Sequence, residues 1–149
     1  MRFAFPFAAL VGVAMACGAP EPAAPAGPKA SPPPASNAGL EDLDGKPAAL
    51  RGADKRADVV LFLRHDCPIS NRYAPTYQRL AESFAGLGVD LWRVYVDADE
   101  SAAVIREHEA EYELPGHALR DPSQRFARDL GVSVTPEAAV FDASGALVY

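Results

Sequence analysis

The hydrophobic and polar positions from residue 57 onward follow two patterns, one typical of buried strands and one typical of helices. Residues 57–63 (ADVVLFL) form a continuous apolar run rich in branched side chains, and residues 89–96 (VDLWRVYV) form a second. Such runs predict strands that are covered on both faces. Between them, residues 68–84 carry apolar side chains at helical spacing, which predicts a helix with Pro68 in its first turn and a kink at Pro75.

The remainder of the chain predicts further helices and strands. Acidic residues at 97–100 precede a predicted helix over residues 101–112. The pair Asp121-Pro122 predicts the start of a short helix that ends at Gly131. The other predicted elements are a hairpin around Asp44-Gly45 that joins residues 40–43 to 48–50, and two strands, at residues 138–141 and 146–149, on either side of a turn.

This order of elements predicts an α/β fold with a central mixed sheet flanked by helices. The sequence ends within the last predicted strand, at Tyr149. We therefore expect the domain to be incomplete at its C-terminus, with its last helix missing.

The N-terminal residues 1–17 have the pattern of an export signal. Arg2 precedes an apolar run over residues 3–13, and small residues stand at Ala14 and Ala16, immediately before Cys17. Two interpretations of Cys17 remain open: lipidation of this cysteine after cleavage at a bacterial lipobox, or ordinary cleavage that leaves a free thiol. We favour lipidation, because a membrane anchor fits the segment that follows.

Residues 18–38 predict a disordered tether. They contain seven of the 14 prolines and show no hydrophobic periodicity, so they cannot bury a core. The remaining residues, 39–149, form the predicted domain. This layout predicts an exported protein, periplasmic or at the cell surface, that a lipid at Cys17 anchors to the membrane.

Composition excludes several classes of protein. The 149 residues include 14 Lys and Arg against 20 Asp and Glu, giving a net charge of −6, which argues against a nucleic-acid partner. Two cysteines exclude a four-cysteine zinc site and a scaffold stapled by several disulfides. The sequence predicts neither a metal site nor a cofactor.

Cys67 is the candidate nucleophile. It lies in the segment RHDCPIS, between the first buried strand and its helix, so its side chain should stand at a helix N-terminus. The free backbone amides at such an end stabilise an anion, which should lower the pKa of the thiol below about 8.5. His65 could add positive charge or transfer a proton, and Ser70, one helical turn later, could donate a hydrogen bond to the thiolate.

Two segments resemble a known group. The stretches DCPISNRYAPTYQRLAESF and VTPEAAVFDASGALVY are similar to bacterial exported redoxins of the thioredoxin-like superfamily, often called alkyl hydroperoxide reductase/thiol-specific antioxidant domains. The resemblance implies a thioredoxin-like fold and a cis peptide bond between Thr135 and Pro136 that faces the reactive cysteine. It also implies that Thr135, Pro136 and Pro68 line the substrate groove.

The chain departs from the two best-known members of that superfamily. Thioredoxins carry a second cysteine where this chain has Ser70, so no resolving cysteine stands there. Peroxiredoxins carry Pro and Thr where this chain has Val60 and Arg64, so the hydroxyl that would orient a peroxide is absent. The predicted function is a thiol-dependent oxidoreductase in which Cys67 alone reacts with a disulfide-bearing protein or a hydroperoxide, and an external thiol reductant resolves the product.

Other interpretations of the same residues stay open. Many lone cysteines are inert and buried, and the fold could serve as a binding, assembly or metal-delivery module with Cys67 as a ligand or a spectator. His65 could be a solvated loop residue. We expect His108 and His117 to lie at the surface.

Overall fold

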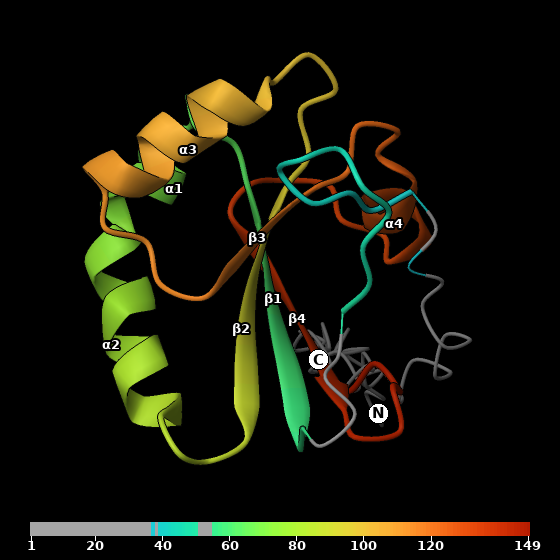
Figure 1. The fold of residues 1–149 in the computed structure, drawn as a ribbon. Helices are drawn as coiled ribbons and strands as arrows, with labels where there is room; N and C mark the ends of the chain where they lie inside the picture. The colour runs from blue at the N-terminus through green and yellow to red at the C-terminus, as the bar shows by residue number, and fades with distance from the viewer. Residues whose placement is uncertain (1–36, 38, 51–54) are drawn as a thin grey trace, which may run out of the picture.

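The computed structural model describes residues 37, 39–50 and 55–149. In this part of the chain, four strands and four helices form layers around one sheet (Figure 1). The strands are β1 (Ala57–Leu63), β2 (Val89–Tyr95), β3 (His117–Arg120) and β4 (Glu137–Asp142). The helices are α1 (Pro68–Arg72), α2 (Ala74–Phe84), α3 (Ala102–Glu111) and α4 (Arg125–Asp129).

The sheet is mixed, as the sequence predicted. Its strand order is β3-β2-β1-β4. The pairs β1–β2 and β2–β3 are parallel, whereas β4 runs antiparallel to β1. The predicted α/β fold with a thioredoxin-like arrangement is therefore confirmed, and β1, which ends beside the candidate nucleophile, lies in the interior of the sheet.

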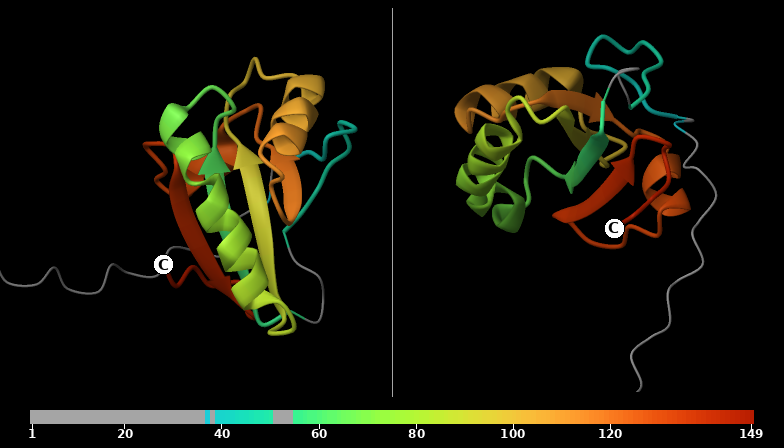
Figure 2. Two further views of the ribbon diagram at one scale, coloured as in Figure 1. Left: turned by 90° about the vertical axis from the view of Figure 1, so that its left-hand side faces the viewer. Right: turned by 90° about the horizontal axis from the view of Figure 1, so that it is seen from below.

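Alternate residues of β1 pack on opposite faces of the sheet. Val60 and Phe62 point to a core under α4 and the segment around Leu40, and Leu61 and Leu63 point to a second core under α2 and α3. Figure 2 shows this layering, with α2 and α3 on one side of the sheet and α4 on the other. The continuous apolar run of β1 follows from this arrangement, because both of its faces are buried.

The helix predicted over residues 68–84 is divided into α1 and α2. The division falls at Tyr73, which ends α1 and precedes Ala74 and Pro75 at the first positions of α2. Proline disfavours helical backbone in the residue before it and donates no amide hydrogen bond, so the predicted kink occurs as a break between two helices.

Several elements differ from the predictions. Strand β3 was not predicted, because its four residues (HALR) are too few to show a period. Helix α4 begins at Arg125 rather than at Asp121-Pro122, since the Asp121 carboxylate caps it by accepting the amides of Arg125 and Ala127. Residues 146–149 and the predicted hairpin around residue 45 make isolated bridges rather than strands.

Part of the predicted organisation falls on residues outside the described ones. These are the signal peptide over residues 1–17, the lipidation site Cys17, and the tether over residues 18–38 apart from Asn37. Within the described ranges, no helix combines the length and hydrophobicity needed to span a membrane.

Candidate functional site

Cys67 stands at the junction that the sequence indicated. It follows the carboxyl end of β1 and is the N-cap residue of α1, with Pro68 in the first turn. Its Sγ atom accepts a hydrogen bond from the Ser70 backbone amide at 3.5 Å. Cys67 is half-buried and pairs with no other cysteine among the described residues, so the sulfur is accessible and held at the positive end of the helix.

The surroundings of Cys67 lower the pKa of its thiol from 9.0 to about 7. The Ser70 side chain is the largest cause, and the partial burial of the sulfur acts in the opposite direction. Backbone amides at the start of α1 and Thr135 contribute further lowering. The Ser70 hydroxyl is buried and has no hydrogen-bond partner among the described residues, so its proton is free to turn toward the sulfur. A large fraction of Cys67 is therefore thiolate at neutral pH.

The segment before β4 faces the sulfur. The Thr135–Pro136 peptide bond is cis, and the Thr135 carbonyl lies 3.4 Å from Cys67 Sγ, where it accepts from the protonated thiol. The structure thus brings Thr135 beside Cys67 from a point 68 residues later in the chain. Pro68 lies exposed on the first turn of α1, directly after Cys67 in the chain.

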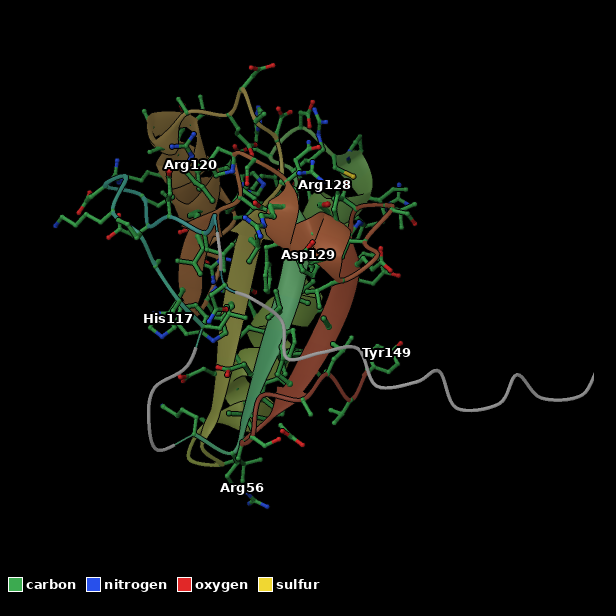
Figure 3. All side chains as sticks on the ribbon, turned by 90° about the vertical axis from the view of Figure 1, so that its right-hand side faces the viewer. Arg56, His117, Arg120, Arg128, Asp129 and Tyr149 are labelled. Atoms are coloured by element: carbon green, nitrogen blue, oxygen red, sulfur yellow. The ribbon has the colours of Figure 1, made fainter. Side chains whose placement is uncertain are left out.

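A shallow cavity of about 230 Å³ adjoins this segment. Its lining includes Arg64, Val134, Thr135 and Arg128 of α4, and Thr135 is the lining residue whose carbonyl contacts Cys67 Sγ. Figure 3 shows Arg128 and the neighbouring Asp129 on α4, at the face of the sheet that carries this helix. Large apolar side chains are exposed around the same region, namely Ile69, Tyr73 and Val134. A substrate that reaches the sulfur therefore has both an apolar surface and a recess beside it.

His65 pairs with a carboxylate rather than with the sulfur. Its ring Nδ1 and its backbone amide both contact Oε1 of Glu100, a side chain that is fully buried. Within the described range 55–149, no hydrogen bond joins His65 to Cys67. A catalytic role for His65 stays a prediction, and its contacts place it as a neighbour that shapes the turn before Cys67.

The expectation that His108 lies at the surface was wrong, whereas His117 is exposed. His108 is 6% exposed and lies between β2 and α1, where its two ring nitrogens contact Tyr95 and Asn71. The spacing along the helix indicates this burial, because His108 follows Ile105 by three residues and precedes Tyr112 by four, which places all three on one helix face. Sequence reasoning also missed Asn71 and Glu100, which carry no motif of their own.

The two peroxiredoxin positions are occupied by residues with structural contacts. Val60 is fully buried in the core beneath the sheet. Arg64 forms ion pairs with Asp66 and Asp97 beside the turn that carries Cys67. Neither side chain supplies a hydroxyl toward the sulfur.

A metal centre finds no support in the described part of the chain. No group of three or more His, Cys, Asp or Glu side chains there is arranged to hold a metal ion. The chemistry that the site offers is that of a single activated thiolate next to a backbone carbonyl and an open recess.

The fold and this site define a thioredoxin-like redoxin domain. The model of the AhpC/TSA family matches residues 33–149, so the chain belongs to the AhpC/TSA family. The match begins a few residues before the domain start predicted at residue 39 and covers Cys67 and Pro136 alike. None of the curated proteins compared with the chain is a significant match.

Solved structures share the fold at low identity. The thioredoxin domain of a thiol-disulfide oxidoreductase from Bacteroides vulgatus has a TM-score of 0.65 at 17% identity, covering 80% of this chain and 86% of that one. A thioredoxin-like protein from Porphyromonas gingivalis has a TM-score of 0.62 at 24% identity, covering 74% of each chain. A secreted disulfide oxidoreductase from Mycobacterium tuberculosis has a TM-score of 0.58 at 20% identity, covering 72% of this chain and 77% of that one.

Proposed function

We propose that this protein is an exported thiol-disulfide oxidoreductase that works through one cysteine. The observation that carries the proposal is the position of Cys67 Sγ, which accepts the Ser70 amide at the start of α1 and lies 3.4 Å from the Thr135 carbonyl. A thiol whose pKa is about 7 is close to the optimum for attack on a disulfide near neutral pH. Two of the structural neighbours are named as disulfide oxidoreductases, which supports the same chemistry.

The reaction has three thiol exchanges. The Cys67 thiolate attacks one sulfur of a substrate disulfide, so a Cys67–substrate disulfide forms and the other substrate sulfur leaves as a thiolate. An external thiolate then attacks the mixed disulfide at the Cys67 sulfur. Attack at Cys67 releases the substrate fully reduced, and a second external thiol restores the Cys67 thiolate. The external thiol supplies both electrons and is oxidised to its disulfide.

Ser70 and the segment around Pro136 have separate roles in this proposal. The Ser70 hydroxyl and amide stabilise the sulfur when it is an anion, both as attacking and as leaving group. Thr135, Pro136 and Pro68 border the groove in which the substrate backbone lies against the sulfur. His65 acts on the turn through its contact with Glu100.

Peroxide reduction is the second candidate, and membership of the AhpC/TSA family favours it. In that reaction the thiolate takes one oxygen of a hydroperoxide, releases the alcohol or water, and becomes a sulfenic acid that two external thiols reduce. We rank it below disulfide exchange because Val60 and Arg64 provide no hydroxyl to orient the peroxide.

Turnover assays distinguish these activities. We expect the chain to catalyse reduction of glutathione disulfide by dithiothreitol, and we expect Cys67→Ser to abolish the catalysed rate. Hydrogen peroxide consumption with the same thiol, measured in parallel, tests the second candidate. Equal rates for the wild type and Cys67→Ser in both assays would contradict an enzymatic role and favour a binding module.

Attachment to a membrane is proposed separately, through lipidation of Cys17. The membrane fraction of expressing bacteria should then contain a chain whose intact mass includes a diacylglyceryl group, and the Cys17→Ala variant should lack it. A soluble mature chain with an unmodified Cys17 would contradict the anchor without affecting the role of Cys67.

A further inference from the structure

The turn that carries Cys67 is held on both sides by one residue, Asn71. The Asn71 side-chain amide donates to the backbone carbonyl of His65 at 2.9 Å, and the Asn71 backbone amide donates to the carbonyl of Cys67 at 3.1 Å. The two bonds bracket the segment from residue 65 to residue 67. Movement of the Asn71 side chain would therefore release the residues immediately before the nucleophile.

The Asn71 side-chain amide lies between two partners, the His65 carbonyl and the His108 ring. Because Asn71 Nδ2 donates to the His65 carbonyl, Asn71 Oδ1 is the atom that faces His108 Nε2, at 2.8 Å. An amide oxygen only accepts hydrogen bonds, so Nε2 must carry the proton. The opposite orientation of the amide would place two acceptors, Asn71 Oδ1 and the His65 carbonyl, against each other.

The second nitrogen of His108 is held from the sheet. With the proton on Nε2, the neutral ring has an acceptor at Nδ1, and the Tyr95 hydroxyl donates to it at 2.9 Å. Tyr95 is fully buried on β2. Its hydroxyl also lies 3.4 Å from Glu109 Oε1, and Glu109 is paired with the buried Arg93. The imidazole is thus fixed at both nitrogens, between the middle of the sheet and α1.

Burial and two nearby positive groups favour the neutral form of the His108 ring, whereas the carboxylates near it act in the opposite direction. Burial is the largest cause that lowers the pKa of His108, followed by the charges of His65 on the turn and Arg93 on β2. Glu109 faces the ring from α3 through Tyr95, and Glu107 and Glu111 line the small recess outside it. The contact with Asn71 requires a proton on Nε2, and burial favours the neutral ring, in which Nδ1 accepts from the Tyr95 hydroxyl.

We propose that His108 is a positioning residue for Cys67, because it fixes the Asn71 amide that holds the turn on which the sulfur is presented. The proposal rests on the proposed function of Cys67 as a nucleophile. His108 touches neither the sulfur nor a substrate, and it acts only through Asn71. No family motif in the quoted segments includes it, since it lies on α3, 41 residues after Cys67.

Substitution at His108 tests the proposal. His108→Leu removes the donor to Asn71, whereas His108→Gln keeps an amide donor that can reach it. His117→Leu is the matched control, because His117 is an exposed histidine at the start of β3, the edge strand (Figure 3). The measurement is the rate and pH midpoint of Cys67 alkylation by iodoacetamide, followed on the Cys67 peptide by mass spectrometry so that Cys17 does not contribute.

At pH 7 we expect alkylation to slow by about threefold to tenfold in His108→Leu, and to stay within about twofold of wild type in His108→Gln and His117→Leu. The comparison is made at a temperature where all chains are folded by circular dichroism. If folded His108→Leu shows the same alkylation rate and the same pH midpoint as the wild type, the positioning role is overturned. A wild-type midpoint at or above about 8.5 would instead contradict the proposed function.

Nitrogen NMR of the unaltered chain gives a test that does not depend on any variant. Ring nitrogen shifts of His108 at pH 7 should show a protonated Nε2 and an unprotonated Nδ1. The Asn71 side-chain amide should exchange with solvent more slowly than the fully solvated side-chain amide of an asparagine in a short unstructured peptide. A ring protonated at Nδ1 alone would overturn the proposal, because Asn71 would then lack its donor.

Discussion

At the scale of single residues, the reactivity of Cys67 depends on a few polar atoms around one sulfur. The Ser70 amide and hydroxyl favour the thiolate, and partial burial opposes them. The balance lowers the pKa to about 7, which leaves roughly half of the thiol ionised at neutral pH. Ser70 occupies the place of the second cysteine of thioredoxins. The residue at this position therefore lowers the pKa of Cys67 and supplies no thiol that could resolve a mixed disulfide.

Ser70→Ala should raise the pKa of Cys67. The substitution removes the largest cause of the lowering and leaves the backbone amide of residue 70 in place. A rise of about one unit would reduce the thiolate fraction at pH 7 about fivefold. The pH dependence of alkylation measures this directly, and an unchanged midpoint would show that the backbone amides alone set the ionisation.

Ser70→Cys should convert the site to an internal dithiol. Residue 70 lies one turn after Cys67, and its backbone amide is already within 3.5 Å of the sulfur. In a Cys17→Ala background, reaction with dithiobis-nitrobenzoate should leave a chain whose intact mass includes one thionitrobenzoate adduct on Cys67. After Ser70→Cys, the introduced thiol should attack that mixed disulfide, expel the adduct and leave an internal disulfide, so the intact mass should show no adduct. A chain that keeps adducts after Ser70→Cys would mean that the introduced thiol cannot reach the mixed disulfide.

At the scale of elements, the edge strand β3 depends on a close approach at Gly116. Its φ is +88°, and a Cβ added there would lie 2.2 Å from the Leu91 carbonyl oxygen on β2. Gly86 has a similar φ of +76° but nothing within 4 Å of an added Cβ. An alanine at Gly86 would therefore meet backbone strain alone, whereas an alanine at Gly116 would meet both backbone strain and a steric clash.

Gly116→Ala should destabilise the fold more than Gly86→Ala does. We expect a loss of about 2–4 kcal/mol in the free energy of unfolding for Gly116→Ala, and about 1 kcal/mol for Gly86→Ala, where only the left-handed backbone is penalised. Urea unfolding measures both values. Equal losses would contradict the account of β3 as a strand placed by direct contact of Gly116 with β2.

The elements that the sequence predicted well are those with a clear period or a strong terminal signal. Strands β1 and β2 were visible as apolar runs, and the break near Pro75 follows from the chemistry of proline. Strand β3 could not be predicted, because its four residues pair with β2 through tertiary contact rather than through any pattern of their own. Helix α4 starts later than predicted, at Arg125, because Asp121 lies before the helix and accepts its first backbone amide rather than forming part of it.

The candidate site was predictable where it lies on one segment and unpredictable where it is assembled from several. Cys67 and Ser70 share a helix N-terminus that the sequence displays. Asn71, Glu100 and His108 come together only through the packing of α1 and α3 on β2. The helix period indicates that His108 lies on the buried side of α3, but the sequence does not show that Asn71 and Tyr95 face it, nor that Glu100 before this helix is buried.

At the scale of the whole molecule, ionisation of Cys67 should couple to folding. The pKa is about 7 in the folded chain, and the unfolded thiol should titrate near its ordinary value of 9.0. Below pH 7 both states keep the proton, so the thiol contributes nothing. Between pH 7 and pH 9 the unfolded state holds more protons than the folded state, so the free energy of unfolding rises with pH.

The difference in unfolding free energy between wild type and Cys67→Ser should therefore shift in favour of wild type as the pH rises from 7 to 9. The full shift in pKa overstates the gain, because the half-buried sulfur is screened by solvent, and we expect about 1 kcal/mol. Urea unfolding at the two pH values checks the sign. A difference that shrinks with rising pH would contradict preferential stabilisation of the thiolate in the fold.

Both layers of the molecule serve to place that sulfur. On one side, α1 presents the Ile69 and Ser70 backbone amides that lower the pKa of Cys67, and on the other side the chain leads through α4 to the segment that ends in Pro136. The most direct test of this account is the pH titration of Cys67 alkylation by iodoacetamide in the intact chain. The account predicts a midpoint of about 7. A midpoint at or above about 8.5, at which the fold would lower the pKa of the thiol little or not at all, would contradict it.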